Sequence, residues 1–332
     1  MTVVYFVVNS EQPEIDYFKP PVPGEMMKLK NQRILISILL SIVASIALGA
    51  TAFSQTPAPV AKQIEIYGQK IHYLEAGSGP NVILLHGLGG DSGSWAQTIP
   101  ALASKFHVYA PDQIGFGKSD KPVLNYRVAT LVDFLAGFYK KTGIEKATLV
   151  GNSLGGWAAA VFTTIYPEKV DKLVLVDAAG YTPKRWGGEE YTEDLYNTLN
   201  PATAAELKRL YGKIFYNKSF LTDQFIEQSF TTKLKRSDAQ TINSFIGSFL
   251  RKDDNLDQKA KNIKAPTLLI WGREDELTPL AIAEAFTQDI AGSKKVIIDK
   301  CGHIPQIEKA AEFNLALLKF LNGDAAVSTS AK

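Results

Sequence analysis

Residues 147–156, Ala-Thr-Leu-Val-Gly-Asn-Ser-Leu-Gly-Gly, join an apolar run to a segment with helical spacing. Ala147–Val150 predicts a short strand, and Leu154–Tyr166 predicts the helix that follows it. Ser153 lies between them with a glycine two residues away on each side, a spacing typical of a sharp strand-to-helix turn in which larger side chains would collide. Such a turn presents the serine hydroxyl above the sheet, near the positive end of the helix. A Gly-Ser turn that only caps a helix is the alternative, and the flanking strand and helix disfavour it.

The same alternation of apolar strands and helical segments continues along the chain. It predicts an α/β fold with a mostly parallel central sheet and helices on both faces. Between Tyr181 and Asn262 there is no convincing strand, only helix-like segments rich in Tyr, Phe, Lys and Asp. We therefore predict an α/β core from residues 63–180 and 263–322, a helical cap from residues 181–262 and a flexible tail from residues 323–332. A separate helical domain is the weaker alternative, because the strand pattern resumes at Thr267.

The predicted elements are short. The expected strands are Gln63–Tyr67, Lys70–Glu75, Asn81–Leu85, Phe106–Ala110, Ala147–Val150, Leu173–Val176, Thr267–Trp271 and Lys295–Asp299. The expected core helices are Ser94–Ser104, Val128–Thr142, Leu154–Tyr166, Pro279–Gln288 and Ala311–Leu321, and those of the cap are Glu193–Leu199, Ala204–Tyr216, Thr222–Leu234 and Asp238–Phe249.

The composition is that of an ordinary globular protein: 332 residues, 45% hydrophobic and 21% charged, with a net charge of +2. This balance gives no reason to expect a nucleic acid as partner. Cys301 is the only cysteine, so the chain forms no internal disulfide and no Cys-rich metal site. The four histidines lack the spacing of paired metal ligands. We therefore expect no metal and no cofactor, and a small molecule as substrate; the oligomeric state stays open.

The N-terminal region has the pattern of an export signal. Lys28, Lys30 and Arg33 precede an uncharged apolar stretch, residues 34–53, and small residues follow it. A basic region, an apolar region and a small-residue exit are typical of a secretory signal peptide. A retained membrane anchor is the alternative for residues 26–54, because the stretch is long enough to span a bilayer. Residues 1–25 fit neither, so we expect translation to begin at Met26 or Met27, and an exported product, periplasmic, secreted or membrane-anchored.

A serine hydroxyl becomes a useful nucleophile only with a base that takes its proton. His303 is the best candidate for that base, because it follows the last predicted strand in a loop that can return over the sheet edge. The histidine in turn needs a carboxylate to orient it. Asp275 follows the strand Thr267–Trp271 and is the favoured acid, while Asp177, after the preceding strand, is the alternative.

Hydrolysis through a tetrahedral intermediate also needs donors to its oxyanion. His86-Gly87-Leu88-Gly89-Gly90 follows the strand Asn81–Leu85, and a glycine-rich turn there can aim a backbone N–H inward. We predict the N–H groups of Leu88 and Leu154 as the oxyanion hole, with His86 bracing the turn. A phosphate loop is disfavoured, because neither GxGxxG nor a GK[ST] ending is present.

From residue 63 to residue 321 the chain resembles the α/β-hydrolase superfamily. Its motifs occur in the order HGLGG, DQIGFGKSD (Asp112–Asp120), GNSLGG, WGREDELTP and CGHIPQIE. Ser153, Asp275 and His303 follow the order of nucleophile, acid and histidine in that superfamily. GNSLGG and the segment after Cys301 look most like the meta-cleavage-product hydrolases, which cut a C–C bond in ring-fission dienoates.

This closer resemblance has departures. Ser229 stands where the resemblance implies a cap arginine that binds the substrate carboxylate, and Ile304 stands where it implies a tryptophan. Gln97 stands where the resemblance implies an asparagine. By this resemblance Gln97 and Ile304 are expected at substrate-binding positions. Nearby Lys233, Lys235 or Arg236 are possible substitutes for the missing arginine.

We therefore predict a serine hydrolase that cleaves small to medium esters through an acyl-enzyme. The alternatives are a C–C hydrolase for dienoates or 1,5-diketones, and a binding or receptor protein with little turnover.

Overall fold

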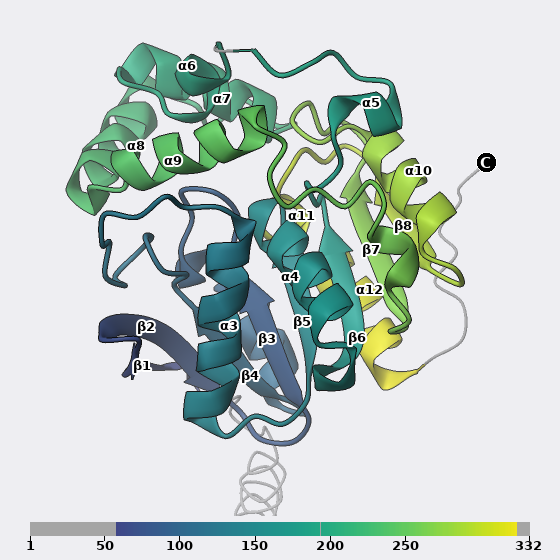
Figure 1. The fold of residues 1–332 in the computed structure, drawn as a ribbon. Helices are drawn as coiled ribbons and strands as arrows, with labels where there is room; N and C mark the ends of the chain where they lie inside the picture. The colour runs from purple at the N-terminus through teal and green to yellow at the C-terminus, as the bar shows by residue number, and fades with distance from the viewer. Residues whose placement is uncertain (1–57, 193, 324–332) are drawn as a thin grey trace, which may run out of the picture. The chain divides into compact units, whose positions relative to one another are not determined.

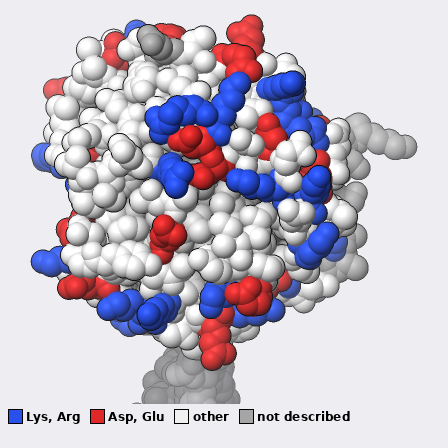
Figure 2. Space-filling model, viewed as in Figure 1, with Lys and Arg blue, Asp and Glu red and all other residues white. Residues whose placement is uncertain are grey.

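The computed structural model describes residues 58–192 and 194–323. The expectations for residues 1–25, for the export signal or anchor at 26–54 and for most of the tail at 323–332 concern residues outside these ranges. No helix in the described ranges is long and apolar enough to cross a membrane. The described surface carries both charge signs, and Figure 2 shows Lys and Arg interspersed with Asp and Glu on one face.

Eight strands form one sheet in the order β1-β2-β4-β3-β5-β6-β7-β8. The first two pairings, β1 with β2 and β2 with β4, are antiparallel, and the other five are parallel. The strands are β1 (Val60–Ile66), β2 (Gln69–Ala76), β3 (Asn81–Leu85), β4 (His107–Pro111), β5 (Ala147–Asn152), β6 (Val170–Val176), β7 (Thr267–Gly272) and β8 (Lys294–Ile298). The predicted α/β fold with a mostly parallel sheet is confirmed.

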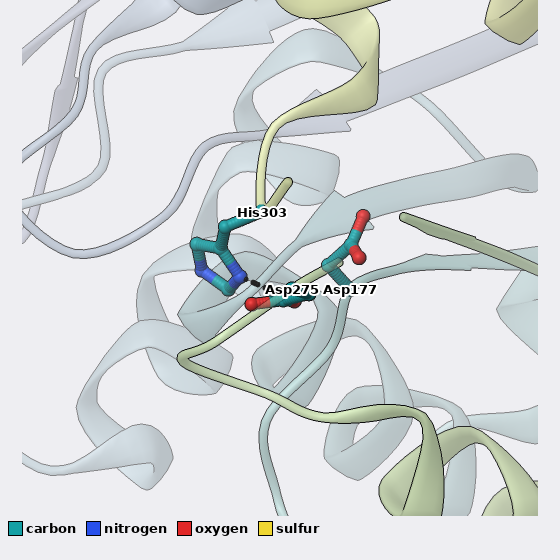
Figure 3. Close-up of side chains that lie close together, drawn as sticks. All are labelled: Asp177, Asp275 and His303. Atoms are coloured by element: carbon teal, nitrogen blue, oxygen red, sulfur yellow. Dashed lines mark hydrogen bonds and ion pairs between the residues drawn. The ribbon is translucent and has the colours of Figure 1, made fainter. Parts of the chain in front are cut away.

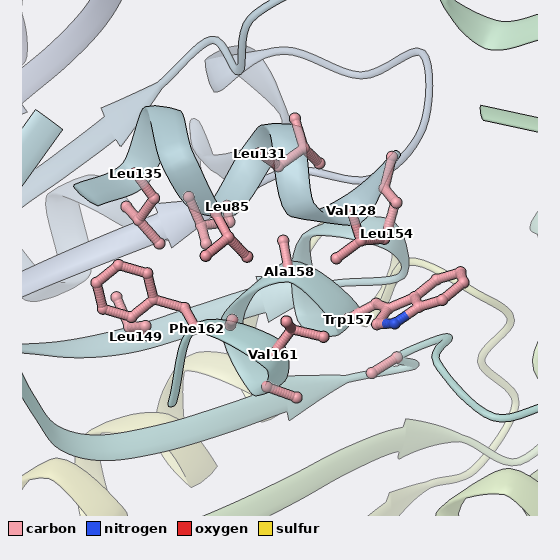
Figure 4. Close-up of a cluster of buried hydrophobic side chains, with 14 of the residues drawn as sticks. Leu85, Val128, Leu131, Leu135, Leu149, Leu154, Trp157, Ala158, Val161 and Phe162 are labelled. Carbon is pink, nitrogen blue, oxygen red and sulfur yellow. The ribbon is translucent and has the colours of Figure 1, made fainter. Parts of the chain in front are cut away.

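Helices cover both faces of this sheet because β3, β5, β6 and β7 are apolar on both sides. On one face lie α3 (Val128–Thr142), α4 (Leu154–Ile165) and α10 (Leu280–Asp289) (Figure 1). Figure 4 shows Leu131 and Leu135 of α3 and Phe162 of α4 packed with Leu85 and Leu149 of the sheet. On the other face α2 (Ile99–Ala103) and α12 (Ala310–Asn322) bury Leu102, Phe313 and Leu317.

Between β6 and β7 the structure has helices and no strand among the described residues. We call α6 (Asp194–Leu199), α7 (Ala204–Ile214), α8 (Asp223–Arg236) and α9 (Ala239–Leu250) the inserted helices. They lie together at the carboxyl ends of the parallel strands (Figure 1). A short helix that was not expected, α5 (Pro183–Trp186), precedes them.

One expected helix is divided in two, and another is preceded by a short helix that was not expected. The segment Ser94–Ser104 is divided into a 3₁₀ turn, Ser92–Trp95, and α2. The Asp91 carboxylate caps the turn by accepting the Gly93 N–H at 2.8 Å, and Pro100, which has no N–H, favours a separate helix start. The last helix, α12, is preceded by a further short helix, α11 (Pro305–Glu308), which begins at a proline.

Candidate active site

Ser153 occupies a strained turn between β5 and α4. Its backbone has φ +54° and ψ −118°, which few residues other than glycine adopt. The turn is so tight that a Cβ on Gly151 would lie 2.3 Å from the Gly155 carbonyl oxygen, and a Cβ on Gly155 would lie 2.3 Å from the Leu85 carbonyl oxygen. Both glycines are therefore required, and the strain at Ser153 is held by the close packing of β3, β5 and α4.

His303 and Asp275 are brought together by the loops that follow β8 and β7. The Nδ1 atom of His303 lies 2.8 Å from Asp275 Oδ2, and both side chains are almost fully buried (Figure 3). Burial opposes ionisation of Asp275, but the nearby His303 and the hydrogen bonds from Thr278 outweigh it and hold the pKa of this carboxyl below its usual value. The pair is suited to orient the imidazole with Nε2 toward a reacting group.

Thr278 completes the support of Asp275, and the sequence reasoning missed it. Its N–H and that of Leu277 donate to Asp275 Oδ1 at 3.0 and 2.8 Å. Its hydroxyl oxygen lies 2.5 Å from Asp275 Oδ2, 3.2 Å from His303 Nδ1 and 3.0 Å from the Asp177 carbonyl oxygen. An aspartate followed by a hydroxyl residue three positions later, as in Asp-Glu-Leu-Thr, was the available signal for this capping turn.

Asp177, the alternative acid, is buried beside this pair but is bonded elsewhere. Its Oδ1 accepts the Gly272 N–H at 2.8 Å, and its Oδ2 is buried without a hydrogen-bond partner in the described structure. Burial, and then the nearby Asp275 carboxylate, raise the pKa of Asp177 well above its usual value. These opposite shifts favour an ionised Asp275 beside a protonated Asp177.

This difference predicts a pH-dependent stability effect of Asp177→Asn. Folded wild type keeps a proton that the unfolded chain loses above about pH 4, so its stability falls as the pH rises from there toward the folded-state pKa. Asparagine has no proton to lose, so the Tm of the variant minus that of wild type should grow between about pH 4 and 8. Thermal denaturation across this range measures it, with Asp133→Asn, on the exposed side of α3, as control. A difference that stays constant or shrinks would show an ionised Asp177.

The carboxylate oxygens of Asp177 and Asp275 and a ring nitrogen of His303 all lie within 4.8 Å of one another. Such a spacing can hold a cation in some proteins. Here the ligand atoms of Asp275 and His303 are already bonded to each other, and Thr278 and backbone N–H groups use the remaining lone pairs of Asp275. This set fits an acid–histidine pair better than a metal site.

Two backbone N–H groups beside Ser153 are available as donors. Leu154 is the first residue of α4, so its N–H has no partner within the helix. Leu88 lies in a turn closed by a hydrogen bond from Gly90 N–H to the Gly87 carbonyl oxygen at 3.1 Å. In the described structure neither N–H donates to a protein group. A Cβ on Gly87 would lie 3.1 Å from Ser153 Cβ, which places this turn directly at the serine.

The buried side chain of His86 supports the turn that carries Leu88. Its Nδ1 lies 2.8 Å from the Gly87 carbonyl oxygen, and its Nε2 lies 3.0 Å from the Gln113 N–H nitrogen. The first contact requires a proton on Nδ1 and the second a lone pair on Nε2, so the ring is neutral. Burial also lowers the pKa of His86. The side chain braces the Leu88 turn and is not placed to act as a base.

A cavity of about 430 Å³ lies between the Leu88 turn and the inserted helices. One part of its wall is apolar and comes mainly from α7, with Leu207, Leu210 and Tyr211. The facing part is polar and comes mainly from α8. Its members are Gln228, Ser229, Thr232, Lys233 and Arg236, with Asp238 at the start of α9.

The histidine loop is joined to the inserted helices at one side of this cavity. His303 N–H donates to the carbonyl oxygen of Ile214, the last residue of α7, at 2.7 Å. Glu308, in α11, accepts the N–H groups of Gly302 at 2.8 Å, Asn217 at 2.6 Å and Tyr216 at 3.2 Å. One carboxylate therefore ties the loop of His303 to the segment that follows α7.

The structure does not bring all the predicted site residues together. Among the described residues no hydrogen bond joins the Ser153 hydroxyl to His303, and such catalytic hydrogen bonds are often long in ligand-free active sites. Asn152, beside it, donates to the His303 carbonyl oxygen at 3.1 Å. Gln97 is exposed, and its amide donates to the Ile307 carbonyl oxygen at 3.4 Å. Of the predicted site residues Leu88 lines the cavity. The others do not: Gln97, Ser153, Leu154, Asp275, His303 and Ile304.

Residues 80–310 match the family model described as the alpha/beta hydrolase fold. The chain belongs to the α/β-hydrolase family. It is 32% identical over 272 residues to a 2-hydroxy-6-oxononadienedioate/2-hydroxy-6-oxononatrienedioate hydrolase of Paraburkholderia phymatum, covering 76% of this chain and 91% of that relative. The predicted resemblance to meta-cleavage hydrolases is thereby confirmed.

Solved structures of two kinds resemble this α/β-hydrolase. One is a membrane phospholipase A described as a bacterial virulence factor, with a TM-score of 0.71 and 27% identity over 91% of this chain and 99% of that one. The other is a variant of the meta-cleavage product hydrolase CumD, with a TM-score of 0.70 and 31% identity over 80% of this chain and 98% of that one. The similar solved structures therefore include both a phospholipase A and a meta-cleavage product hydrolase.

Proposed function

We propose that this hydrolase cleaves carboxylic esters through an acyl intermediate on Ser153. The observation that carries the proposal is the His303–Asp275 pair, bonded at 2.8 Å and attached through Asn152 to the strained turn that presents the serine. An arrangement of this kind supplies a nucleophile, a base and an acid that fixes the tautomer of the base.

The reaction follows from these positions. His303 Nε2 takes the hydroxyl proton while Ser153 Oγ attacks the ester carbonyl carbon, and the carbonyl oxygen becomes an oxyanion that accepts from the Leu88 and Leu154 N–H groups. The tetrahedral intermediate then expels the alcohol, which leaves with the proton from His303. A water molecule, deprotonated by His303, attacks the acyl group in the same way and releases the acid together with free Ser153.

Cleavage of a C–C bond next to a ketone is the second candidate, and the sequence relatives favour it. Hydrolases that act on dienoates and dienedioates match this chain at about 31% identity. The cavity argues the other way, because Ser229 lies in its wall where the resemblance implies an arginine. Serine cannot form the charge-assisted bidentate pair by which an arginine fixes a carboxylate, and a lysine nearby supplies only a point charge.

A substrate panel separates these two candidates. We expect measurable hydrolysis of short-chain 4-nitrophenyl esters, and a kcat/KM for a ring-fission dienoate at least about 10²-fold lower than for the best ester. The physical reason is the missing bidentate contact, which leaves the dienoate poorly oriented. Esters of increasing acyl length are assayed beside the dienoate at the same pH. Equal or better cleavage of the dienoate would establish the C–C reaction instead.

We also propose export from the cytoplasm, on the basis of the pattern in residues 26–54. Expression in a bacterial host from Met1 or from Met26 should yield a product outside the cytoplasm. Mass spectrometry of the purified protein should find a new N-terminus near Phe53 or Gln55. An intact N-terminus in washed membranes would indicate an anchor, and protein confined to the cytoplasm would contradict both forms of the proposal.

A further inference from the structure

We propose that Lys233 forms a binding site for an oxyanion of the substrate, a carboxylate or a phosphate, in the wall of the cavity beside the Leu88 turn. This inference rests on the proposed ester hydrolysis and adds to it a substrate class: esters that carry a second, anionic group. Lys233 lies on α8, four residues after Ser229, so both side chains share one face of the helix and line the cavity.

The ammonium group of Lys233 is held in place by one hydrogen bond and has further hydrogens free to donate. Its Nζ donates to Asn200 Oδ1 at 2.7 Å, which leaves two of its three hydrogens for a ligand. Among the described residues no carboxylate lies within 4.0 Å of it. A half-buried ammonium without a carboxylate in contact is unfavourable, and burial lowers the pKa of Lys233 accordingly. A bound oxyanion would supply the missing partner.

The other two cations that could substitute for an arginine at position 229 are not available. Lys235 is exposed, and it does not line the cavity. Arg236 lines the cavity but is already engaged: its Nη1 donates to the Gly89 carbonyl oxygen at 2.7 Å, and its Nη2 pairs with the Asp91 carboxylate. Arg236 therefore stabilises the turn that carries Leu88, and Lys233 remains as the cation for a ligand.

Asp238 is the one carboxyl that lines the same cavity. Its side chain is 2% exposed and does not cap α9, and burial raises its pKa. The charges of Lys233 and Asp238 attract each other across a distance too long for an ion pair. An anionic ligand and the Asp238 carboxylate would compete for the charge of Lys233. Removal of the Asp238 charge should therefore raise the affinity of the site for an anion. The apolar residues of α7 opposite would accept the hydrocarbon part of the same ligand.

Two matched esters test the site. 4-Nitrophenyl hydrogen adipate and 4-nitrophenyl hexanoate have acyl chains of equal length that end in a carboxylate and in a methyl group. The readout is the ratio of their kcat/KM values, adipate over hexanoate. We expect Lys233→Met to lower this ratio at least about tenfold, mainly through KM, because a charge-assisted hydrogen bond is lost. Lys233→Arg should retain most of it, Asp238→Asn should raise it, and the exposed control Lys235→Met should leave it unchanged.

Isothermal titration calorimetry measures anion binding without turnover. It therefore also detects a site that binds an anionic group in the alcohol part of the ester. Hexanoate and hexyl phosphate are titrated into the full-length protein and into Lys233→Met, and the tighter ligand identifies the oxyanion. A tenfold loss in the ester ratio, or in the affinity for either anion, supports the site. If Lys233→Met changes neither, the site is refuted, whether or not the esters are cleaved. If wild type cleaves no ester but binds an anion through Lys233, the proposed reaction fails and the site stands.

Discussion

Replacing Ser153 by alanine is expected to lower kcat for a 4-nitrophenyl ester by on the order of 10⁶, while the fold is retained. The loss is large because the acyl intermediate cannot form, and neither His303 nor the Leu88 and Leu154 N–H groups can take over the nucleophile's part. Steady-state kinetics on the purified variant measure the loss. Ser104→Ala, at an exposed position after α2, is the matched control and should behave as wild type.

Covalent labelling gives an independent test of the same serine. A fluorophosphonate should modify wild type at Ser153 and leave Ser153→Ala unmodified, as peptide mass spectrometry would show. Modification of a different serine, with loss of activity, would overturn the assignment of the nucleophile even if Ser153→Ala were inactive. The inactivity of that variant would then come from altered packing of the turn.

Asp275→Asn should lower kcat by about 10⁴, the next largest effect. An asparagine amide in place of Asp275 Oδ2 would face His303 Nδ1, favour the wrong tautomer and remove the charge that stabilises the imidazolium. Asp177→Asn should cost far less, because the raised pKa of Asp177 favours its neutral form and its carboxyl is bonded to Gly272 rather than to His303. Both variants are assayed on one ester at the same pH. A severe loss in Asp177→Asn with a mild one in Asp275→Asn would reverse the two roles.

Local patterns predicted much of the fold. The expected strand Asn81–Leu85 and the expected helix Val128–Thr142 agree with β3 and α3 at both ends. β3 is a continuous apolar run ending at a glycine-rich turn, and α3 has a regular apolar face that ends at Gly143 with φ +73°. In such segments the residues that decide the structure are neighbours in the sequence, so the pattern is sufficient.

The candidate site could be predicted only in part, because many of its contacts join distant residues. The order of Ser153, Asp275 and His303 indicated their grouping, and the structure pairs the last two. The sequence did not reveal which side chains of α8 reach the cavity. Lys233 and Lys235 are two residues apart on one helix, yet one lines the cavity and the other is exposed. That distinction depends on how α8 packs against α7 and the Leu88 turn.

The Glu308 carboxylate has a consequence for how a substrate enters. It accepts the N–H of Gly302, next to the histidine, and the N–H groups of Tyr216 and Asn217, in the segment that follows α7. If that segment moved outward to admit a bulky molecule, these hydrogen bonds would therefore draw the loop of His303 with it and away from the serine. Substrate entry and catalysis would then take place in two different states of the protein, because the open state lacks the base beside the serine. Water that reached the serine in the open state would find no base beside it, so an acyl group bound there would be protected until closure.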